Sequence, residues 1–328
     1  MNLKGNLSGK PHENLTNIWA VWLIVVAVVL HVLSVSIPRA SETIFLYEQN
    51  FSGERIAPFR YRILHVWLVQ GIRQLFPQPD TLGIILAAAL LSSFALAIWL
   101  WLSYRLFCRV YSEQLALIGL ASLVAADRIA QWQMATAQQD VSYSWIEAAL
   151  FASALHVLLG WHKRPRPVLY GLIVLLGSLN RETALILVIW VAGVVQPQMK
   201  KRRALLLLAG YGGLWVSVFW GLRLIIPATG AVVPVVDAQI YNLNHLSMAL
   251  IVPALFFGPW PILVRRGWRL APHIFRQVSF GTLLYLCAYI LFARWWEIRV
   301  VLPIMPVLVG TGLAAFKSSE VHSGTTHA

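Results

Sequence analysis

Charged residues interrupt long apolar runs at four places, and these are the places where the sequence could do chemistry. The four stretches are 38–62, 127–147, 180–183 and 294–299. Each carries arginine together with glutamate or aspartate at or close to the edge of an apolar run. Guanidinium groups bind phosphate and carboxylate through forked N–H donors, and carboxylates can accept protons. The residue types therefore favour a site for an anionic ligand.

The first stretch is predicted to form the long loop after the first membrane span. Its charged residues of interest are Glu42, Glu48, Glu54, Arg60 and Arg62. In the second stretch, a helix that begins at Asp140 would place Asp140, Ser144 and Glu147 on one face, because they are spaced at i, i+4 and i+7. Glu147 would then lie about two turns into a span.

The third and fourth stretches lie at span ends. Arg181 and Glu182 are neighbours, and neighbouring helical residues point about 100° apart, so we expect them to reach different partners. In the fourth stretch, Glu297 is three residues after Arg294 and could pair with it, whereas Arg299 lies within the last span. Arginine rather than lysine at these places suits planar recognition of phosphate.

Composition indicates that most of the chain is surrounded by lipid. The 328 residues are 59% hydrophobic and 12% charged, whereas soluble domains carry about 25% charged residues. We predict an all-α fold, a polytopic membrane helix bundle with about ten transmembrane helices. The predicted spans are the runs 18–37, 82–106, 115–126, 143–161, 168–180, 183–197, 204–226, 246–264, 277–293 and 298–316.

The segment 60–77 differs from these spans, because arginines interrupt apolar residues that recur at helical spacing. It is predicted to be an amphipathic helix in the plane of the membrane interface, within the first outer loop. The alternative is a short, imperfect span.

The lysines predict the orientation. All of them (4, 10, 163, 200, 201 and 317) fall on one side if both termini are cytoplasmic, and lysine-rich loops stay inside. The prediction is a plasma (inner) membrane protein with a cytoplasmic tail at 1–17, one transmembrane domain at 18–316 and a cytoplasmic tail at 317–328. The net charge of +13 is then explained by the basic residues that keep the cytoplasmic loops inside. No nucleic acid is expected as a partner. On the opposite side, arginines and acids occur in equal number, with no lysine.

Other polar residues carry weaker signals. His31, His65 and His156 stand alone on apolar faces, and we expect them to be packed rather than to bind metal. Cys108 and Cys287 lie far apart in or beside apolar runs and suggest neither a disulfide nor a metal site.

Three short motifs resemble the C-type (GT-C) glycosyltransferase superfamily of multi-pass membrane enzymes, including uncharacterised bacterial members. They are 57–64 (APFRYRIL), 179–183 (LNRET), and 297–299 (EIR) followed by Pro303 and Pro306. The first is similar to a "YRY-x-PLL" type stretch of membrane mannosyltransferases. The resemblance implies a sugar donor linked to polyprenyl phosphate and a glycan or lipid acceptor at the outer face.

The resemblance also implies roles for individual residues. The residues expected to bind the donor and its phosphate are Arg60, Arg62, Arg181, Glu182, Glu297 and Arg299. The family usually places its catalytic acid, an aspartate, in the first outer loop. Here that loop offers glutamates, so the candidate bases are Glu42 and then Glu48, with Asp140 as the alternative. A divalent metal (Mg²⁺ or Mn²⁺) could assist through carboxylates, although no spacing requires one.

Two other functions fit the same sequence. A transporter or lipid flippase would need paired broken helices around a midplane site, and no second pair matching 168–197 is evident. A non-catalytic membrane scaffold of the same fold is the other alternative.

Overall fold

The computed structural model describes residues 11–38, 40–52, 62–76, 80–136, 142–226, 235–295 and 297–323. Every regular element in these ranges is a helix. In chain order they are α1 (Pro11–His31), π-helical η1 (Val32–Ser36), α2 (Ala40–Ser52), α3 (Ile63–Arg73), α4 (Asp80–Cys108), α5 (Glu113–Thr136), α6 (Ser142–Leu159), α7 (Pro167–Asn180), 3-10 helix η3 (Glu182–Ala184), α8 (Leu185–Val195), α9 (Lys201–Ile225), α10 (Val235–Asn244), α11 (Leu246–Phe257), α12 (Trp260–Gly267), α13 (His273–Phe292), 3-10 helix η4 (Ile298–Ile304) and α14 (Met305–Ser323).

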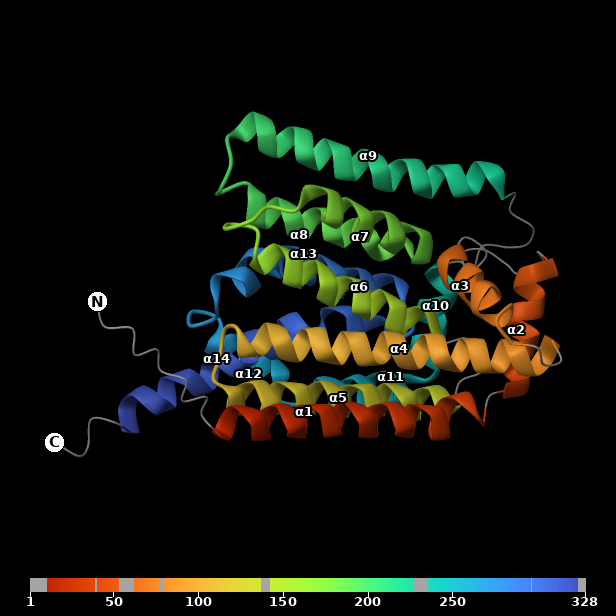
Figure 1. Cartoon of the computed structure of the whole chain (residues 1–328), viewed down its shortest axis with the longest axis horizontal. Helices are drawn as coiled ribbons and strands as arrows, with labels where there is room; N and C mark the ends of the chain where they lie inside the picture. Colours follow the sequence, from red (N-terminus) through yellow and green to blue (C-terminus); the bar gives the residue numbers. More distant parts are fainter. Residues whose placement is uncertain are drawn as a thin grey trace, which may run out of the picture.

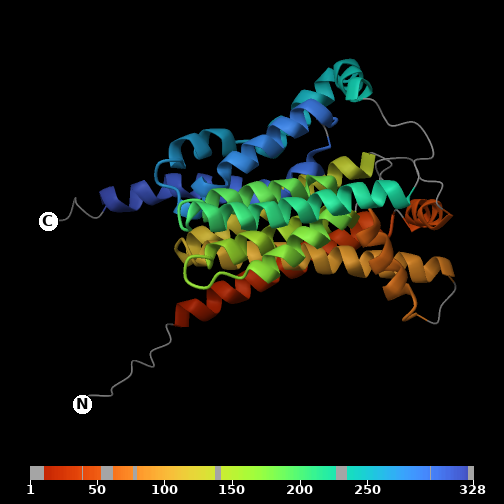
Figure 2. The same ribbon diagram turned by 90° about the horizontal axis from the view of Figure 1, so that it is seen from above.

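The long helices lie side by side along one axis (Figure 1). Helices α2, α3 and α10 gather at one end of this bundle, which we call the α2–α3 end (Figures 1 and 2). Helix α1 begins, and α14 finishes, at the opposite end, which we call the terminal end. The connection from α8 to α9 also lies at the terminal end.

The length and apolarity of the helices indicate a multi-pass membrane protein. In the part of the chain that the structure describes, six helical segments are long and apolar enough to cross a membrane: Asn17–Ser36, Thr81–Cys108, Glu113–Trp132, Lys201–Ile225, His273–Phe292 and Ile298–Phe316. The pair α10–α11, bent by 94°, would make a seventh if it is one broken span. Three apolar helices are shorter: Ser144–Leu159, Pro167–Asn180 and Glu182–Val195.

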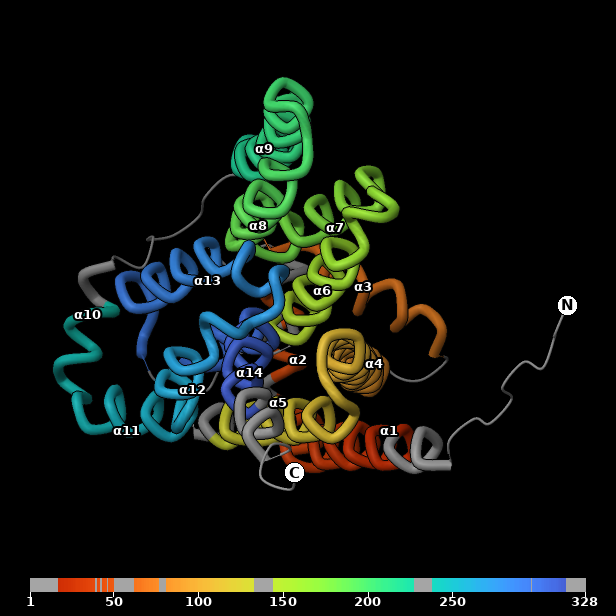
Figure 3. Tube along the Cα trace, turned by 90° about the vertical axis from the view of Figure 1, so that its left-hand side faces the viewer, coloured from red at the N-terminus to blue at the C-terminus, as the bar shows by residue number. Residues whose placement is uncertain are grey.

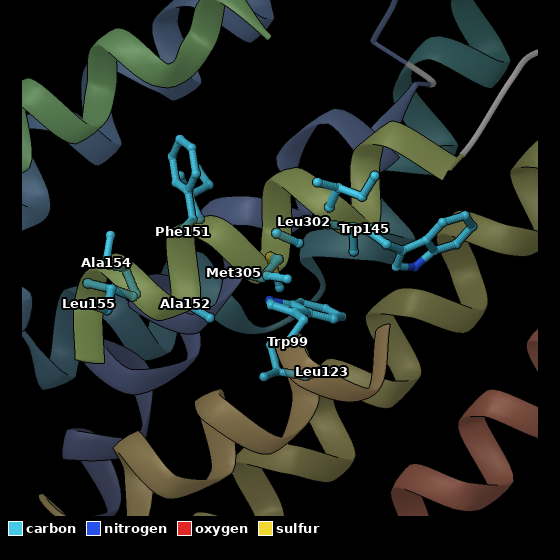
Figure 4. Close-up of a cluster of buried hydrophobic side chains, with 14 of the residues drawn as sticks. Trp99, Leu123, Trp145, Phe151, Ala152, Ala154, Leu155, Leu302 and Met305 are labelled. Carbon is cyan, nitrogen blue, oxygen red and sulfur yellow. The ribbon is translucent and has the colours of Figure 1, made fainter. Parts of the chain in front are cut away.

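The centre and the edge of the bundle differ sharply in packing. In the apolar part of Ile298–Phe316, 89% of the residues are buried, whereas in that of Lys201–Ile225 only 6% are buried. Viewed from the terminal end, α14 lies among α4, α5, α6, α12 and α13, and α9 lies at the edge (Figure 3). Wholly buried Trp99 of α4 points toward Met305 of α14 beside Leu123 (Figure 4). Few residues of α9 are therefore fully covered by the rest of the chain.

Two glycines allow helices to approach closely. A Cβ atom on Gly193 of α8 would lie 2.1 Å from the carbonyl oxygen of Gln277 in α13. A Cβ atom on Gly267 of α12 would lie 2.3 Å from the carbonyl oxygen of Thr311 in α14. Small residues commonly allow such close contacts between membrane helices.

The structure corrects several predicted boundaries. The run 246–264 is not one helix, because α11 stops at Phe257 and Gly258, at φ +43°, turns the chain before Pro259. Glycine tolerates this backbone angle, and proline cannot continue the hydrogen bonding of the preceding helix. The run 115–126 belongs to the longer helix α5.

The predicted interfacial helix and tails also differ in extent. Within 60–77, the helix is α3, and it begins only at Ile63. Its residues Leu64 and Val69 are buried, and Trp67 is exposed, so it is amphipathic as predicted. Helix α1 already begins at Pro11 and α14 continues to Ser323. Their candidate spans, Asn17–Ser36 and Ile298–Phe316, agree with the predicted runs 18–37 and 298–316.

Candidate functional site

The break between α7 and α8 sets the geometry of the candidate site. The polar residues Asn180, Arg181 and Glu182 separate two apolar helices. The backbone at Arg181 is extended (φ −164°, ψ 144°), although its N–H still donates to the carbonyl of Gly177 at 2.7 Å. Because of this break, Arg181 and Glu182 point to different partners: Arg181 reaches a carboxylate and Glu182 reaches a guanidinium group.

Glu147 of α6 receives hydrogen bonds from several elements. The Arg181 guanidinium donates to it at 2.7 Å, and the Thr183 hydroxyl donates to its other oxygen. The Tyr285 hydroxyl lies 3.3 Å from that same oxygen and donates to the carbonyl of Val300 at 2.6 Å. Glu147 therefore joins α6, the α7–α8 break and α13, and Tyr285 links it to η4.

Glu182 forms the second ion pair of the site. Arg62, the residue before α3, donates from Nη2 to Glu182 at 3.3 Å. The indole N–H of Trp215 in α9 donates to the Glu182 backbone carbonyl at 3.0 Å. Three elements that are distant in sequence thus meet at Glu182. We call Arg62, Glu147, Arg181, Glu182, Thr183 and Tyr285 the Arg181 cluster.

Burial makes the charges of this cluster energetically costly unless they are paired. The exposed fractions of the Glu147 and Arg181 side chains are 3% and 9%, and that of Arg62 is 7%. Glu182 is more open, with 33% of its side chain exposed. Removing one partner of a buried ion pair leaves a buried charge, at a cost of about 3–5 kcal/mol. Ionisable groups inside membrane bundles commonly mark functional sites.

The structure confirms that Arg181 and Glu182 have different partners, as the sequence predicts. The reason differs from the predicted one, because Arg181 has an extended backbone rather than a helical one. Arg299 is 2% exposed in η4 and directly precedes Val300, whose carbonyl accepts the Tyr285 hydroxyl. Glu297, the residue before η4, is half-buried. Both therefore lie on the segment that Tyr285 connects to Glu147.

Of the residues predicted to act as the catalytic base, the structure describes only some. Glu42 and Glu48 both lie on α2, and Glu48 is exposed. Tyr47, which is wholly buried, contacts the ring of His65 at 6.0 Å between centroids. This contact brings α2 to the first turn of α3, next to Arg62. The side chain of Glu42, and all of Glu54, Arg60 and Asp140, lie outside the described residues.

The sequence predictions did not identify the central role of Glu147. A signal was present, since it is the one acid in the apolar stretch 145–159. Thr183, Tyr285 and Trp215 were also not predicted as site residues. A hydroxyl or indole in an apolar helix carries no sequence signal that separates a site from ordinary packing.

A second buried polar group lies between α1, α4, α5 and α6. Wholly buried Asp127 accepts hydrogen bonds from Trp145 at 2.8 Å, Gln131 at 2.5 Å and Arg128 at 3.3 Å. The remaining members are His31 and Ser92, whose side chains are 3.0 Å apart. The His31 ring contacts Trp145 edge to face at 4.3 Å. We call these residues the Asp127 cluster.

The histidine predictions can be checked directly. His31 and His65 are wholly buried, as expected for packed residues, and His156 is half-buried. Among the described residues, no group of three or more histidine, cysteine, aspartate or glutamate side chains is arranged to hold a metal ion. Cys108 and Cys287 are both free thiols.

Comparison of the chain with protein-family models, with curated proteins and with solved structures gives no match. The functional argument therefore starts from the geometry of the Arg181 cluster.

Proposed function

We propose that this protein is a membrane glycosyltransferase that transfers a sugar from a polyprenyl-phosphate donor to a glycan or lipid acceptor at the outer face of the membrane. The observation that carries the proposal is the burial of two arginines, Arg62 and Arg181, each held by a carboxylate where several helices begin or end. The short motifs that resemble the GT-C superfamily coincide with these arginines.

The ion pairs suit phosphate recognition because they orient the guanidinium groups. A guanidinium offers five N–H donors in a rigid plane, and a carboxylate that engages one edge fixes the direction of the rest. Arg181 is held by Glu147 at 2.7 Å and Arg62 by Glu182 at 3.3 Å. In this proposal both arginines bind the donor phosphate, and Arg299 of η4, with Arg60, completes the anionic site.

The proposed reaction is a displacement at the anomeric carbon. A carboxylate accepts the proton of the acceptor hydroxyl while the hydroxyl oxygen bonds to that carbon. The bond between the anomeric carbon and the phosphate oxygen breaks, and the prenyl phosphate leaves with the electron pair. Arginine N–H groups stabilise the negative charge that develops on the departing phosphate.

The base is proposed to lie on α2 or just before α6. Glu42 and Glu48 are carried by α2, which packs on α3 through Tyr47 and His65. Asp140 remains the alternative base. Glu147 is less suited to accept a proton from substrate, because Arg181 and Thr183 already hold it. A Mg²⁺ or Mn²⁺ ion could assist through carboxylates, although the described residues contain no group of three or more potential ligands arranged to hold one.

The proposed topology has about ten crossings, with both termini cytoplasmic and the α2–α3 end outside. The candidate spans, the bent pair and the three shorter apolar helices together give this number. In a variant without Cys108 and Cys287, Gln70→Cys should react with an impermeant maleimide added to intact cells. His162→Cys should react only after lysis. Labelling of His162→Cys from outside would contradict the orientation.

The function itself is tested by transfer from a radiolabelled polyprenyl-phosphate sugar in membranes that contain the protein. Arg62→Lys and Arg181→Lys keep the charge but lose the fork, and each should weaken donor binding by about tenfold. Arg223→Lys is the matched control, since Arg223 stacks on the Phe219 ring of α9. Unchanged donor binding in both site variants, or equal loss in the control, would contradict the phosphate assignment.

A transporter or flippase is the second candidate, and the helix breaks favour it. The chain breaks between α7 and α8, and α10 meets α11 at 94°. Discontinuous helices are typical of transporter sites. A transporter would move the prenyl-linked sugar across vesicle membranes without forming a new glycosidic bond. Translocation without transfer would replace the enzyme proposal, and neither activity would indicate a scaffold.

A further inference from the structure

A groove lies at the terminal end of the bundle, far along α9 from the Arg181 cluster. It has a volume of about 340 Å³ and is formed by the α8–α9 connection and the first two turns of α9. Its lining residues are Gln196, Met199, Lys201, Ala204, Leu205 and Leu208. The walls are mostly apolar, and Lys201 supplies the one formal charge among the lining residues.

Lys201 lines the groove, and its neighbours in the sequence are also basic. Lys200, Lys201, Arg202 and Arg203 are consecutive and exposed. The sequence contains no aspartate or glutamate from Thr183 to Val236, so neither α8 nor α9 carries an acid that could neutralise them. An apolar groove with a lysine in its lining, and three further cations next to that lysine in the sequence, is complementary to a molecule with an anionic head and a hydrocarbon chain.

We propose that this groove is a binding site for an acidic phospholipid, with an acyl chain against Met199, Leu205 and Leu208 and the phosphate at Lys201. Basic pockets between membrane helices at the bilayer surface are a recognised way to bind anionic headgroups. Helix α9 supports this occupant, because only 6% of the residues in its apolar part are buried against the rest of the chain. Lipid therefore has direct access to the groove. The bound lipid fills the space beside the weakly packed start of α9.

The apolar walls of the groove distinguish a specific lipid site from general attraction between a basic loop and an acidic membrane. General attraction depends on the number of cations and not on the apolar walls. Loop 160–166 provides the comparison, since Lys163, Arg164 and Arg166 are also exposed cations at the terminal end. Leu205 and Leu206 give a second comparison. Both are exposed on α9, at 54% and 65%, but only Leu205 lines the groove.

The experiment is native mass spectrometry of the purified protein with phosphatidylglycerol or phosphatidylcholine. The wild type should retain one phosphatidylglycerol with at least about tenfold preference over phosphatidylcholine. Lys201→Gln should weaken that retention by about fivefold, the effect of losing one cation near a bilayer surface. Leu205→Trp should fill the groove and weaken it by at least as much. Glycerol phosphate, which lacks the chains, should not displace the lipid.

Two controls decide between the site and general attraction. Leu206→Trp and Lys163→Gln should both retain phosphatidylglycerol like the wild type. Equal losses in Leu205→Trp and Leu206→Trp, or in Lys201→Gln and Lys163→Gln, would overturn the proposal. So would equal retention of the two lipids by the wild type. All four positions are exposed, and thermal unfolding of each variant checks that the fold is intact.

Discussion

The Arg181 cluster and the Asp127 cluster are both buried and both contain ionised side chains, yet they are built differently. Asp127 accepts hydrogen bonds from its own helix, through Arg128 and Gln131, and from the indole of Trp145. Glu147 and Glu182 instead bind residues that lie 34 and 120 positions away, Arg181 and Arg62. The first carboxylate is held mainly within one helix, and the other two connect distant parts of the chain.

The positions of the residues along their helices explain this difference. Asp127 and its partners lie within continuous helices, where the backbone is rigid and already hydrogen-bonded. Arg62 and Arg181 lie immediately before or after helices, and Glu182 begins the three-residue 3-10 helix η3. A change in backbone angles at such positions requires little other rearrangement. The Asp127 cluster is therefore suited to fix helices together, and the Arg181 cluster is suited to adjust around a ligand. Helix α6 takes part in both, through Trp145 and Glu147.

The largest expected effect comes from breaking the buried pair of the Arg181 cluster. Arg181→Met leaves Glu147 charged and buried, and it should lower the free energy of unfolding by about 3–5 kcal/mol. The double variant Glu147→Met/Arg181→Met removes both charges and should recover most of that loss, because apolar replacement of a whole buried pair is often neutral. Denaturant titration in mixed micelles measures the stabilities.

Activity separates a ligand site from a structural tie in this double variant. We expect stability to return without donor binding, since the guanidinium that we propose binds phosphate is absent. Recovery of both stability and transfer would mean that the Arg181 cluster only joins helices, like the Asp127 cluster.

The second expected effect concerns the Asp127 cluster. Asp127→Asn keeps an oxygen that can accept the Trp145 indole N–H, but it places an amide donor near Gln131 or Arg128. We expect a loss of about 1–3 kcal/mol, the usual cost of a mismatched buried polar group. Donor affinity and transfer rate should be unchanged in the variant that remains folded. If transfer fell as far as in Arg181→Met, the distinction between the two clusters would fail.

The sequence predicted much of this comparison, but not its centre. Apolar runs identified most of the long helices, and the polar interruption at 180–183 marks the break between α7 and α8. The predicted loop 38–62 was wrong in part, because Ala40–Ser52 forms the helix α2, whose polar residues hide it among the loop residues. The pairing of Arg62 with Glu182 was not predicted, because no local pattern specifies a contact across 120 positions. The bend at Gly258 was also missed, since the apolar run continues through it while the backbone does not. Asp127 was counted among the charges of the stretch 127–147 without a role of its own, although it is wholly buried.

The smallest expected effect tests whether α9 positions the Arg181 cluster. Trp215 stacks on Phe219, with ring centroids 4.9 Å apart, and its indole N–H holds the Glu182 carbonyl at 3.0 Å. Trp215→Phe keeps an aromatic ring for the stacking contact but removes this donor. The free energy of unfolding should fall by about 0.5–1.5 kcal/mol, the net value of one hydrogen bond. Because Glu182 orients Arg62, donor affinity should also fall a few-fold, seen as a raised KM at nearly constant kcat.

Trp220→Phe on the same helix is the control, since Trp220 is 58% exposed and contacts the ring of Phe219 rather than the cluster. It should change neither stability nor KM by a measurable amount. A lowered stability in Trp215→Phe with an unchanged KM would assign Trp215 to the packing of α9 alone. A raised KM that also appears in Trp220→Phe would indicate a general loosening of α9. Only a KM effect confined to Trp215 supports a chain of contacts in which α9 holds Glu182, Glu182 holds Arg62, and Arg62 binds the donor.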